Sequence, residues 1–539
     1  MASPNRRGRV EYARVPVVPE PSAPYMVAIV SNRLRTDTPG FPFRMSRRGD
    51  RGRWACPGAE SRQSAGAAAT ETRAMEITAT LSAFAATLTL ERLPPEVTER
   101  ARYLVLDLVG NIVRARHDAE STESLLRAAR ALGFAGGASG VFGDAARYTP
   151  PGAALLNGAL GHSLDFDDTH AAASLHPGAP VIPAALAAAE MVGAHGADVL
   201  AAIVAGYEVT CRIALALPAA AHYDRGFHPT ATCGAFGAAA AAARVFGLDA
   251  AGVAGALGTV LSQAAGSLEF LVNGAWTKRF QVGWAATNGL VAATLVREGF
   301  KGAAAALEGP HGFLRATAPD PRPERAIQDL GRVYELMATA VKPYPSCRYG
   351  HAGIDAAIAL RAEFGLAAEE VESVILGLPR AGMNLIGLPA EKKADPANVV
   401  DGQFSGPFVV ANALATGAMG WDSYRLLRDG TVRALLGKIR CEFDPEIEAE
   451  FPANMSGKVT VRARGRAFAR KVVVPKGEPG NFLTEAELRA KFHGLTDAVL
   501  GPERAARLAD AVLGIARAPD MGALMRLAAP AMATRLAGE

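Results

Sequence analysis

Between Glu76 and about residue 340, apolar residues recur every three or four positions, which is the period of one face of an α-helix. The adjacent Pro94 and Pro95 suit the start of such a helix. After them, the residues on one face are Val97, Ala101, Leu104, Val105, Leu108 and Ile112. Similar Ala-, Leu- and Val-rich segments follow, with glycines at their ends and almost no β-branched alternation. We therefore expect residues 75–340 to form a large all-helical domain.

The pattern changes after Lys342, where apolar residues alternate with other residues and so predict strands. The predicted strands are Val371–Gly377, Ile439–Phe443 and a hairpin of Val459–Ala463 with Phe468–Val474. Helices are predicted between them, over Phe404–Ala415 and Ser423–Leu436, and the helical pattern returns from Thr484. The expected fold is mainly α, with a smaller α+β domain, residues 341–480, inserted before C-terminal helices, residues 481–539, that return to the helical domain.

Residues 1–74 have a different composition, with thirteen Arg, no Lys and six acidic residues. They are rich in Pro, Ser and Gly without sustained periodicity, which predicts a disordered extension. Our preferred explanation is that Met75 is the natural start. The whole chain has a net charge of +4, so the part after residue 74 has a net charge of −3. We therefore expect no nucleic-acid binding by the folded part.

Two further features narrow the class of protein. No run of about 18 uncharged apolar residues predicts a membrane span. The five cysteines are scattered and form no CxxC pair, which argues against a disulfide framework or a zinc ribbon and fits a reducing, cytoplasmic location. They are Cys56, Cys211, Cys233, Cys347 and Cys441.

The segment Gly161–Pro180, GHSLDFDDTHAAASLHPGAP, gathers carboxylates, a hydroxyl and three histidines between two apolar segments. It predicts a polar loop that is followed by a helix from about Val181 to Val192. Burying such groups unpaired would cost several kcal/mol each, so the loop is a candidate site. The alternative is that its Asp and Thr side chains only cap helices.

Two other interpretations of this loop are weaker. A metal site would need histidines at ligand spacing, and no HxxxH or HExxH pair is present, so we expect no metal. DFDDT also matches the aspartate-rich signature of terpene cyclases. Carbocation cavities need aromatic walls, however, and only 6% of the residues are aromatic.

Three other polar segments follow the same format of His or Lys beside Gly or Pro. They are GFHPTATCG with His228, GAWTKRFQVGWAA with Lys278, and KPYPSCRYGH with Lys342, Cys347, Arg348 and His351. Each could be structural alone, as a helix cap, a surface lysine or a hinge. Four such segments along one helical domain are better explained by a shared cleft. The mixture of Lys, His and Arg suits a small polyanionic substrate.

Together these motifs, with QFSGPFVVANAL and PKGEPGN, resemble the MmgE/PrpD family over about residues 76–535. That family includes 2-methylcitrate dehydratases, cis-aconitate decarboxylases and iminodisuccinate epimerases. The resemblance implies a homodimer with no metal or organic cofactor, in which the α+β domain is a lid over the active site. It places the family's site positions on Asp165, Thr169, His176, His228, Lys278 and Lys342.

The implied chemistry is proton transfer at a carbon next to a carboxylate of a small di- or tricarboxylate. Within that chemistry we expect His228 to act as acid/base and Lys278, Lys342 and His176 to bind carboxylates and stabilise charge. Asp165 and Thr169 would orient the loop. Cys347 and His351 are further candidates for substrate binding. Because the cis-aconitate decarboxylases carry a His where this chain has Cys347, we expect a dehydratase-type lyase.

Three alternatives to a dehydratase stay open. They are an epimerase or a decarboxylase of the same family, and a catalytically silent protein that only binds a polycarboxylate.

Overall fold

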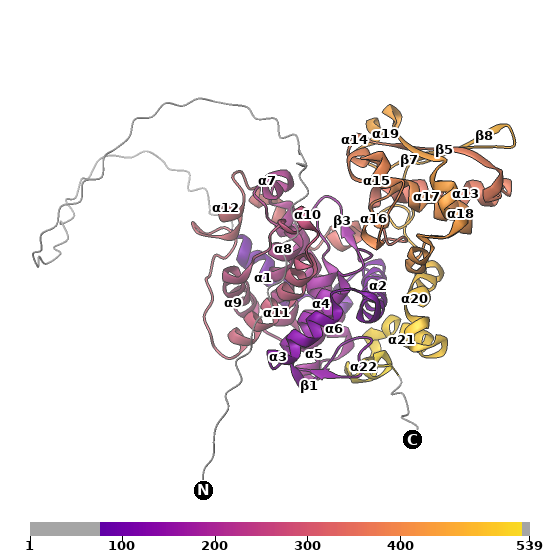
Figure 1. The fold of residues 1–539 in the computed structure, drawn as a ribbon. Coiled ribbons are helices and arrows are strands. Elements are labelled where there is room, and N and C mark those ends of the chain that lie inside the picture. Colours follow the sequence, from indigo (N-terminus) through magenta and orange to yellow (C-terminus); the bar gives the residue numbers. More distant parts are fainter. Residues whose placement is uncertain (1–75, 531–539) are drawn as a thin grey trace, which may run out of the picture. The chain divides into compact units, whose positions relative to one another are not determined.

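Helix α8 (Pro229–Val245) lies at the centre of the first hydrophobic core, where α5 (Gly178–Val192), α6 (Gly196–Leu215), α9 (Ala250–Val260) and α11 (Thr277–Arg297) pack against it (Figure 1). The structure is a computed structural model that describes residues 76–530, and these belong to one compact unit. The expectations for residues 1–74 lie outside the described residues.

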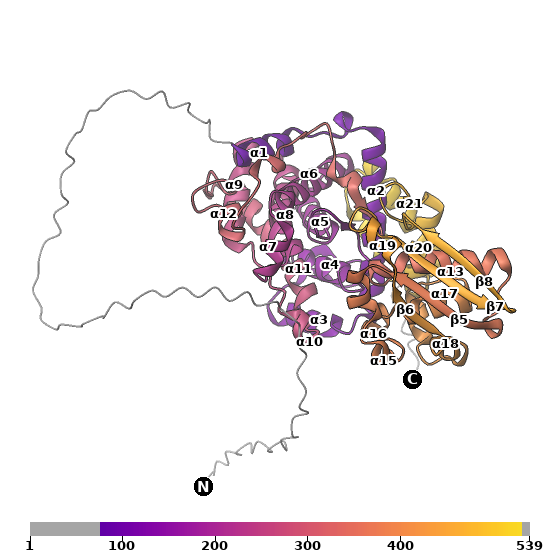
Figure 2. The same ribbon diagram turned by 90° about the horizontal axis from the view of Figure 1, so that it is seen from above.

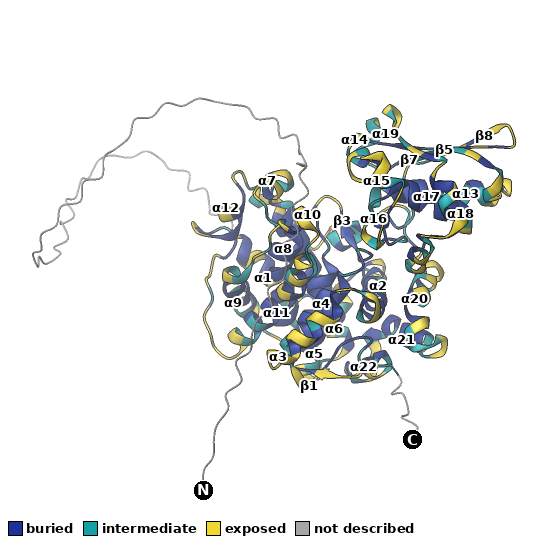
Figure 3. Cartoon of the chain, in the orientation of Figure 1, coloured by how far each residue is buried: buried dark blue, intermediate teal, exposed yellow. Residues whose placement is uncertain are grey.

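Small residues let these helices approach closely. A side chain at Gly237 of α8 would clash with Thr210 and with the backbone of Gly206, both on α6. A side chain at Gly283 of α11 would clash in the same way with the backbone of α4 (Pro150–Gly161). The Ala-rich sequence therefore encodes backbone-to-backbone packing, and α4, α5 and α8 are buried along most of their length (Figure 3).

The predicted helix after Pro94 is α2 (Pro95–Asp118), and its predicted apolar face is buried. The other helices of this part are α1 (Ile77–Thr87), α3 (Thr122–Ala131), α7 (Ala219–Asp224), α10 (Phe270–Asn273) and α12 (Phe313–Thr317). The expectation of an all-helical domain is too simple, because two small antiparallel sheets occur here. One pairs β1 (Ala135–Gly140) with β2 (Arg147–Tyr148), and the other pairs β3 (Thr169–His170) with β4 (Thr339–Ala340).

A second hydrophobic core lies between Ile354 and Phe468 and surrounds a four-stranded sheet of order β6-β5-β7-β8. The strands are β5 (Val371–Leu378), β6 (Ile439–Phe443), β7 (Gly457–Ala463) and β8 (Arg466–Val472), which confirms the predicted strands. β5 runs parallel to β6 and antiparallel to β7, and β7 forms the predicted hairpin with β8.

Helices α13 (His351–Phe364) and α17 (Gly406–Thr416) pack beside this sheet (Figure 2). The predicted helix over Ser423–Leu436 is interrupted: a 3-10 turn ends at Leu426, and α18 (Gly430–Leu436) starts after the cap that Asp429 provides. The shorter helices are α14 (Arg380–Gly382), α15 (Ala390–Lys393), α16 (Val399–Gln403) and α19 (Pro445–Glu450).

The chain ends in the helices α20 (Glu485–Leu500), α21 (Pro502–Leu513) and α22 (Gly522–Ala528). Leu488, Phe492 and Leu495 of α20 are buried in the first core, where α20 packs on α2. This return matters for the site, because it brings Lys491 next to residues more than 300 positions earlier in the chain. Within the described residues, no helix is long and apolar enough to span a bilayer.

Candidate active site

The polar loop predicted from the sequence connects α4, which ends at Gly161, to α5, which begins at Gly178 rather than at Val181. Three distant elements hold the loop in place. Gln403 of α16 donates a hydrogen bond to the carbonyl oxygen of Leu164 at 2.8 Å, and Asn111 of α2 donates one to that of Phe166 at 3.2 Å. The pairing of β3 with β4 fixes the loop at Thr169 and His170. The loop is therefore positioned by tertiary contacts on several sides.

Asp165 lies between two lysines from different parts of the chain. Nζ of Lys278, on α11, lies 3.1 Å from Oδ1, and Nζ of Lys342 lies 3.1 Å from Oδ2. Burial disfavours the charged carboxylate, but the positive charges of Lys278 and Lys342 outweigh burial and lower the pKa of Asp165 below its ordinary value. Two ammonium groups thus share one carboxylate, which leaves one positive charge unneutralised within this group of three.

Asp167 lies between two imidazoles in the same loop. Nδ1 of His162 is 2.7 Å from Oδ2, and Nδ1 of His176 is 3.4 Å from the same oxygen. Burial again opposes ionisation, but the contacts with His162 and His176 hold the pKa of Asp167 well below its ordinary value. Because a carboxylate only accepts hydrogen bonds, Nδ1 of His162 carries the proton.

His228 lies close to the two imidazoles that contact Asp167, and its ring centroid is 6.0 Å from that of His162. It precedes α8, and its Nδ1 is 2.8 Å from Nε2 of Gln281, so the amide donates and Nδ1 accepts. Burial, reinforced by the neighbouring His162 and by the positive charge of Lys278, lowers the pKa of His228 well below its ordinary value. A neutral His228 therefore carries its proton on Nε2.

Asp168 has a structural role at the start of α5. Its Oδ1 accepts a hydrogen bond from the backbone N–H of Gly178 at 3.1 Å, and its Oδ2 accepts one from the hydroxyl of Tyr207 at 2.6 Å. Burial raises the pKa of Asp168 to about 7. The capping interpretation is thus correct for this one aspartate, while Asp165 and Asp167 have other partners.

Lys491 of α20 lies beneath the loop. Its Nζ is 2.5 Å from Asp107 of α2 and donates hydrogen bonds of 2.8 Å to the carbonyl oxygens of Phe166 and Lys342. The same ammonium group lies 3.7 Å from the centroid of the Phe166 ring. The buried ammonium group of Lys491 thereby links three parts of the chain: the loop of Asp165, the backbone at Lys342 and α2.

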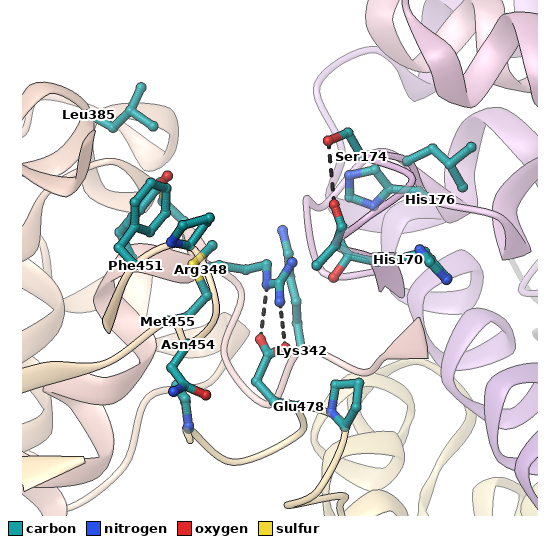
Figure 4. Close-up of a pocket in the computed structure, with 18 of the residues that line it drawn as sticks. His170, Ser174, His176, Lys342, Arg348, Leu385, Phe451, Asn454, Met455 and Glu478 are labelled. Atoms are coloured by element: carbon teal, nitrogen blue, oxygen red, sulfur yellow. Dashed lines mark hydrogen bonds and ion pairs between the residues drawn. The ribbon is translucent and has the colours of Figure 1, made fainter. Parts of the chain in front are cut away.

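A cavity of about 690 Å³ opens above these groups. Figure 4 shows Ser174 and His176 on one side of it and Leu385, Phe451 and Met455 on the other. Lys342 and Arg348 lie between the two sides, and Arg348 is paired with Glu478. The cavity therefore has a charged part and an apolar part.

The structure brings most of the predicted site residues together. Asp165, Thr169, His176, Lys342 and Cys347 line the cavity. Lys278 and His228 do not line the cavity. Lys278 contacts Asp165 directly, and the ring of His228 lies next to that of His162.

His351 does not line the cavity either. It is buried at the start of α13, where its Nε2 lies 3.2 Å from the carbonyl oxygen of Ser346.

Some residues around the site were missed by the sequence analysis. His162 and Asp167 lie inside the loop that the sequence singled out, and their spacing carried no further signal. Arg348 was named in its motif but not assigned to the site. Gln281 lies in the quoted motif of Lys278 but was not assigned to the site. Asp107 and Lys491 lie in helices that the sequence analysis did not single out, and only their three-dimensional neighbours reveal them.

Among residues 76–530, one set of side chains has donor atoms close enough for a metal ion. The ligand atoms of His162, Asp167 and His176 lie within 4.8 Å of one another. The 2.7 Å contact between His162 and Asp167 is also the length of an ordinary charge-assisted hydrogen bond, so this contact needs no ion. Nδ1 of His176 is further away, at 3.4 Å from the same oxygen.

Cys347 is not set up as a nucleophile or base. Burial raises the pKa of its thiol to about 11, so the thiol is neutral near pH 7. Within the described residues, Cys347 and the other three cysteines are free.

Two family comparisons match most of the chain. The sequence model of the MmgE/PrpD N-terminal domain matches residues 79–326, and that of the MmgE/PrpD C-terminal domain matches residues 344–516. The gap between the two matches, residues 327–343, contains Lys342, which lines the cavity.

Similar curated proteins have related names. A cis-aconitate decarboxylase-like protein, oryM, of Aspergillus oryzae is 28% identical over 84% of this chain and 97% of its own length. A cis-aconitate decarboxylase of Aspergillus terreus is 26% identical over 84% of this chain and 95% of its own length. The human cis-aconitate decarboxylase is 29% identical over 56% of this chain and 63% of its own length.

Proposed function

Because the chain belongs to the MmgE/PrpD family, we propose that it is a lyase that acts on a small di- or tricarboxylate without a metal or organic cofactor. The observation that carries the proposal is the pair of lysines on Asp165. Two ammonium groups against one carboxylate leave a positive charge at the edge of a cavity, which favours an anionic ligand. A substrate carboxylate would bind Lys342, which lines the cavity, while Lys278 would add its positive charge through the Asp165 carboxylate that both lysines contact.

The proposed reaction begins with proton transfer at the carbon next to a carboxylate. Removing that proton builds negative charge on the carboxylate oxygens, and the lysines would stabilise this charge in the transition state. His176 and His228 are the two candidates for acid/base. We favour His176, because it lines the cavity and its Nδ1 faces Asp167, so that its other ring nitrogen is free to face a ligand. Thr169 also lines the cavity and would help to orient the substrate.

Two lyase reactions fit this arrangement. In the dehydratase, an acid protonates the leaving hydroxyl of a substrate such as 2-methylcitrate. The decarboxylase needs no initial proton removal: the carbon–carboxylate bond breaks, CO₂ leaves, and the acid/base then protonates the carbon that keeps the electron pair. The presence of Cys347 supports the first. The names of the relatives that match across 84% of the chain support the second.

One panel assay tests the proposal. The full chain would be incubated with 2-methylcitrate, cis-aconitate and iminodisuccinate, while alkene absorbance, released CO₂ and proton exchange in deuterated water are followed. Absorbance gain without CO₂ identifies a dehydratase, and CO₂ release identifies a decarboxylase. Exchange without either product identifies an epimerase. Tight binding with no exchange or product would contradict the proposal and leave a binding protein.

We further propose a homodimer, in which the second core and its sheet act as a lid over the cavity. Large apolar side chains are exposed on α10, α11 and the turn between them: Leu271 at 70%, Val272 at 77%, Trp276 at 42%, Phe280 at 42% and Trp284 at 39%. A patch of this kind is typical of a contact between protein chains. Light scattering after size exclusion would test it, and a monomeric mass would refute the dimer.

A further inference from the structure

The cavity has more apolar surface than a small polycarboxylate can use. Leu385, in the turn Met383–Gly387, is 46% exposed on the cavity side, although its neighbour Ile386 is buried in the second core. Phe451 and Met455 lie on the same side of the cavity (Figure 4), Phe404 also lines it, and all three are half-buried. None of these four side chains offers a group that could neutralise a carboxylate. Their exposed area is covered by water until an apolar group replaces it.

The charged part of the cavity lies next to this wall. Lys342 and Arg348 lie between the loop of His176 and the apolar side chains (Figure 4). Arg348 is held there by Glu478, with Nε 3.0 Å from Oε1 and Nη2 2.5 Å from Oε2. A ligand whose carboxylates contact the two cations would therefore have its other end against Leu385, Phe451 and Met455.

The size of the cavity supports the same conclusion. At about 690 Å³ it lies in the range of roughly 300–1,000 Å³ that is typical for drug-sized ligands. A citrate-sized acid would occupy only the charged part. A further carboxylate would gain nothing from the apolar wall, because moving a charge from water to an apolar surface is costly.

We propose that the ligand of this cavity is a polycarboxylate that carries an extended alkyl or aryl substituent, with the substituent packed on the wall of Leu385, Phe404, Phe451 and Met455. This inference rests on the proposed function for the charged part. It adds to that function a substrate class that is larger than citrate or methylcitrate.

The test is calorimetric binding of citrate, 2-methylcitrate, 2-butylcitrate and 2-hexylcitrate to the full chain at one pH and ionic strength. Each added methylene that becomes buried should lower Kd about three- to fourfold. The heat capacity change of binding should become more negative along the series.

Two variants locate the effect. Leu385→Gln and Met455→Gln should each weaken the dependence of Kd on chain length, because a polar group replaces part of the wall. Leu388→Gln is the matched control: Leu388 is 45% exposed, close to Leu385 in the chain, and does not line the cavity. The control should keep the full chain-length dependence.

The outcomes separate this inference from the proposed function. If citrate binds but Kd is constant or rises with chain length, the apolar wall is not a substituent site and the inference is overturned. An equal loss of chain-length dependence in Leu388→Gln would also overturn it. If none of the four acids binds, the proposed function fails as well.

Discussion

The side-chain ammonium group of Lys342 contacts Asp165 twice, at its carboxylate and at its backbone carbonyl oxygen. Its Nζ lies 3.1 Å from Oδ2 and donates a hydrogen bond of 2.8 Å to the carbonyl oxygen of the same residue. Asp165 has φ of +53°, a left-handed conformation that is uncommon for a residue with a side chain. Lys342 therefore stabilises a strained loop, and its positively charged side chain also lines the cavity.

The first prediction concerns the two lysines on Asp165. Lys278→Ala and Lys342→Ala should each lower kcat/KM by about 10²–10³, the scale of losing a charge-stabilising donor in a preorganised site. Because both contact the same carboxylate, the double variant should be less impaired than the product of the two single effects. Steady-state kinetics would measure this, with the exposed Lys301→Ala as the control. Strictly multiplicative effects would mean that the lysines act independently.

The second prediction concerns the buried charge beneath the loop. Lys491→Met should destabilise the protein by about 3–5 kcal/mol, because it leaves the buried Asp107 unpaired and removes donors to two carbonyl oxygens. Adding Asp107→Leu should recover part of the loss. Urea unfolding would measure both variants.

The control for this prediction lies on the same helix. Arg489 pairs with the half-exposed Glu485, so Arg489→Ala should change the stability by less than about 1 kcal/mol. If Lys491→Met lowers the free energy of unfolding no more than Arg489→Ala does, Lys491 does not stabilise the loop.

The third prediction is a pH dependence of stability at His351. Burial, with the positive charge of Lys342, lowers the pKa of His351 to about 3, while an unfolded histidine titrates near pH 6.5. Between these values the unfolded chain binds a proton that the folded chain does not. The free energy of unfolding should therefore fall with decreasing pH, by about 1.4 kcal/mol per pH unit from this group.

Substituting His351 isolates this contribution. His351→Gln should flatten the slope of unfolding free energy against pH between about pH 4 and 6 by that amount, as measured by urea unfolding at several pH values. An unchanged slope would show that His351 is not held neutral by the fold.

The fourth prediction is that activity does not depend on a metal. The donor atoms of His162, Asp167 and His176 are close enough to hold an ion, but a hydrogen bond accounts for the shortest contact, that between His162 and Asp167. Turnover should therefore survive prolonged dialysis against EDTA, followed by assay in metal-free buffer. Loss of turnover that Zn²⁺ or Mg²⁺ restores would identify these three residues as metal ligands.

The predictions from sequence succeeded where the signal is local. The spacing of apolar residues after Pro95 predicted α2, and alternation predicted β5, β6 and the hairpin of β7 with β8. Periodicity works for such elements because a buried face repeats with the geometry of its own backbone. It failed for β3 and β4, which are two residues long and pair across about 170 positions, so that no repeat can form.

The sequence by itself determined which segments carry the chemistry, since polar residues between apolar helices are costly unless they have partners. Tertiary structure decided which partner each one has. Asp165, Asp167 and Asp168 are nearly adjacent in sequence, yet one holds two lysines, one holds two histidines and one caps a helix. The partners of Asp165 depend on α11 and Lys342 meeting at the loop, and the bond from Tyr207 to Asp168 depends on α6. The two histidines of Asp167 lie in the loop itself. Charges and hydrogen bonds act over a few ångströms in space, and no local pattern encodes the contact of Asp165 with Lys278, which lies 113 positions later in the chain.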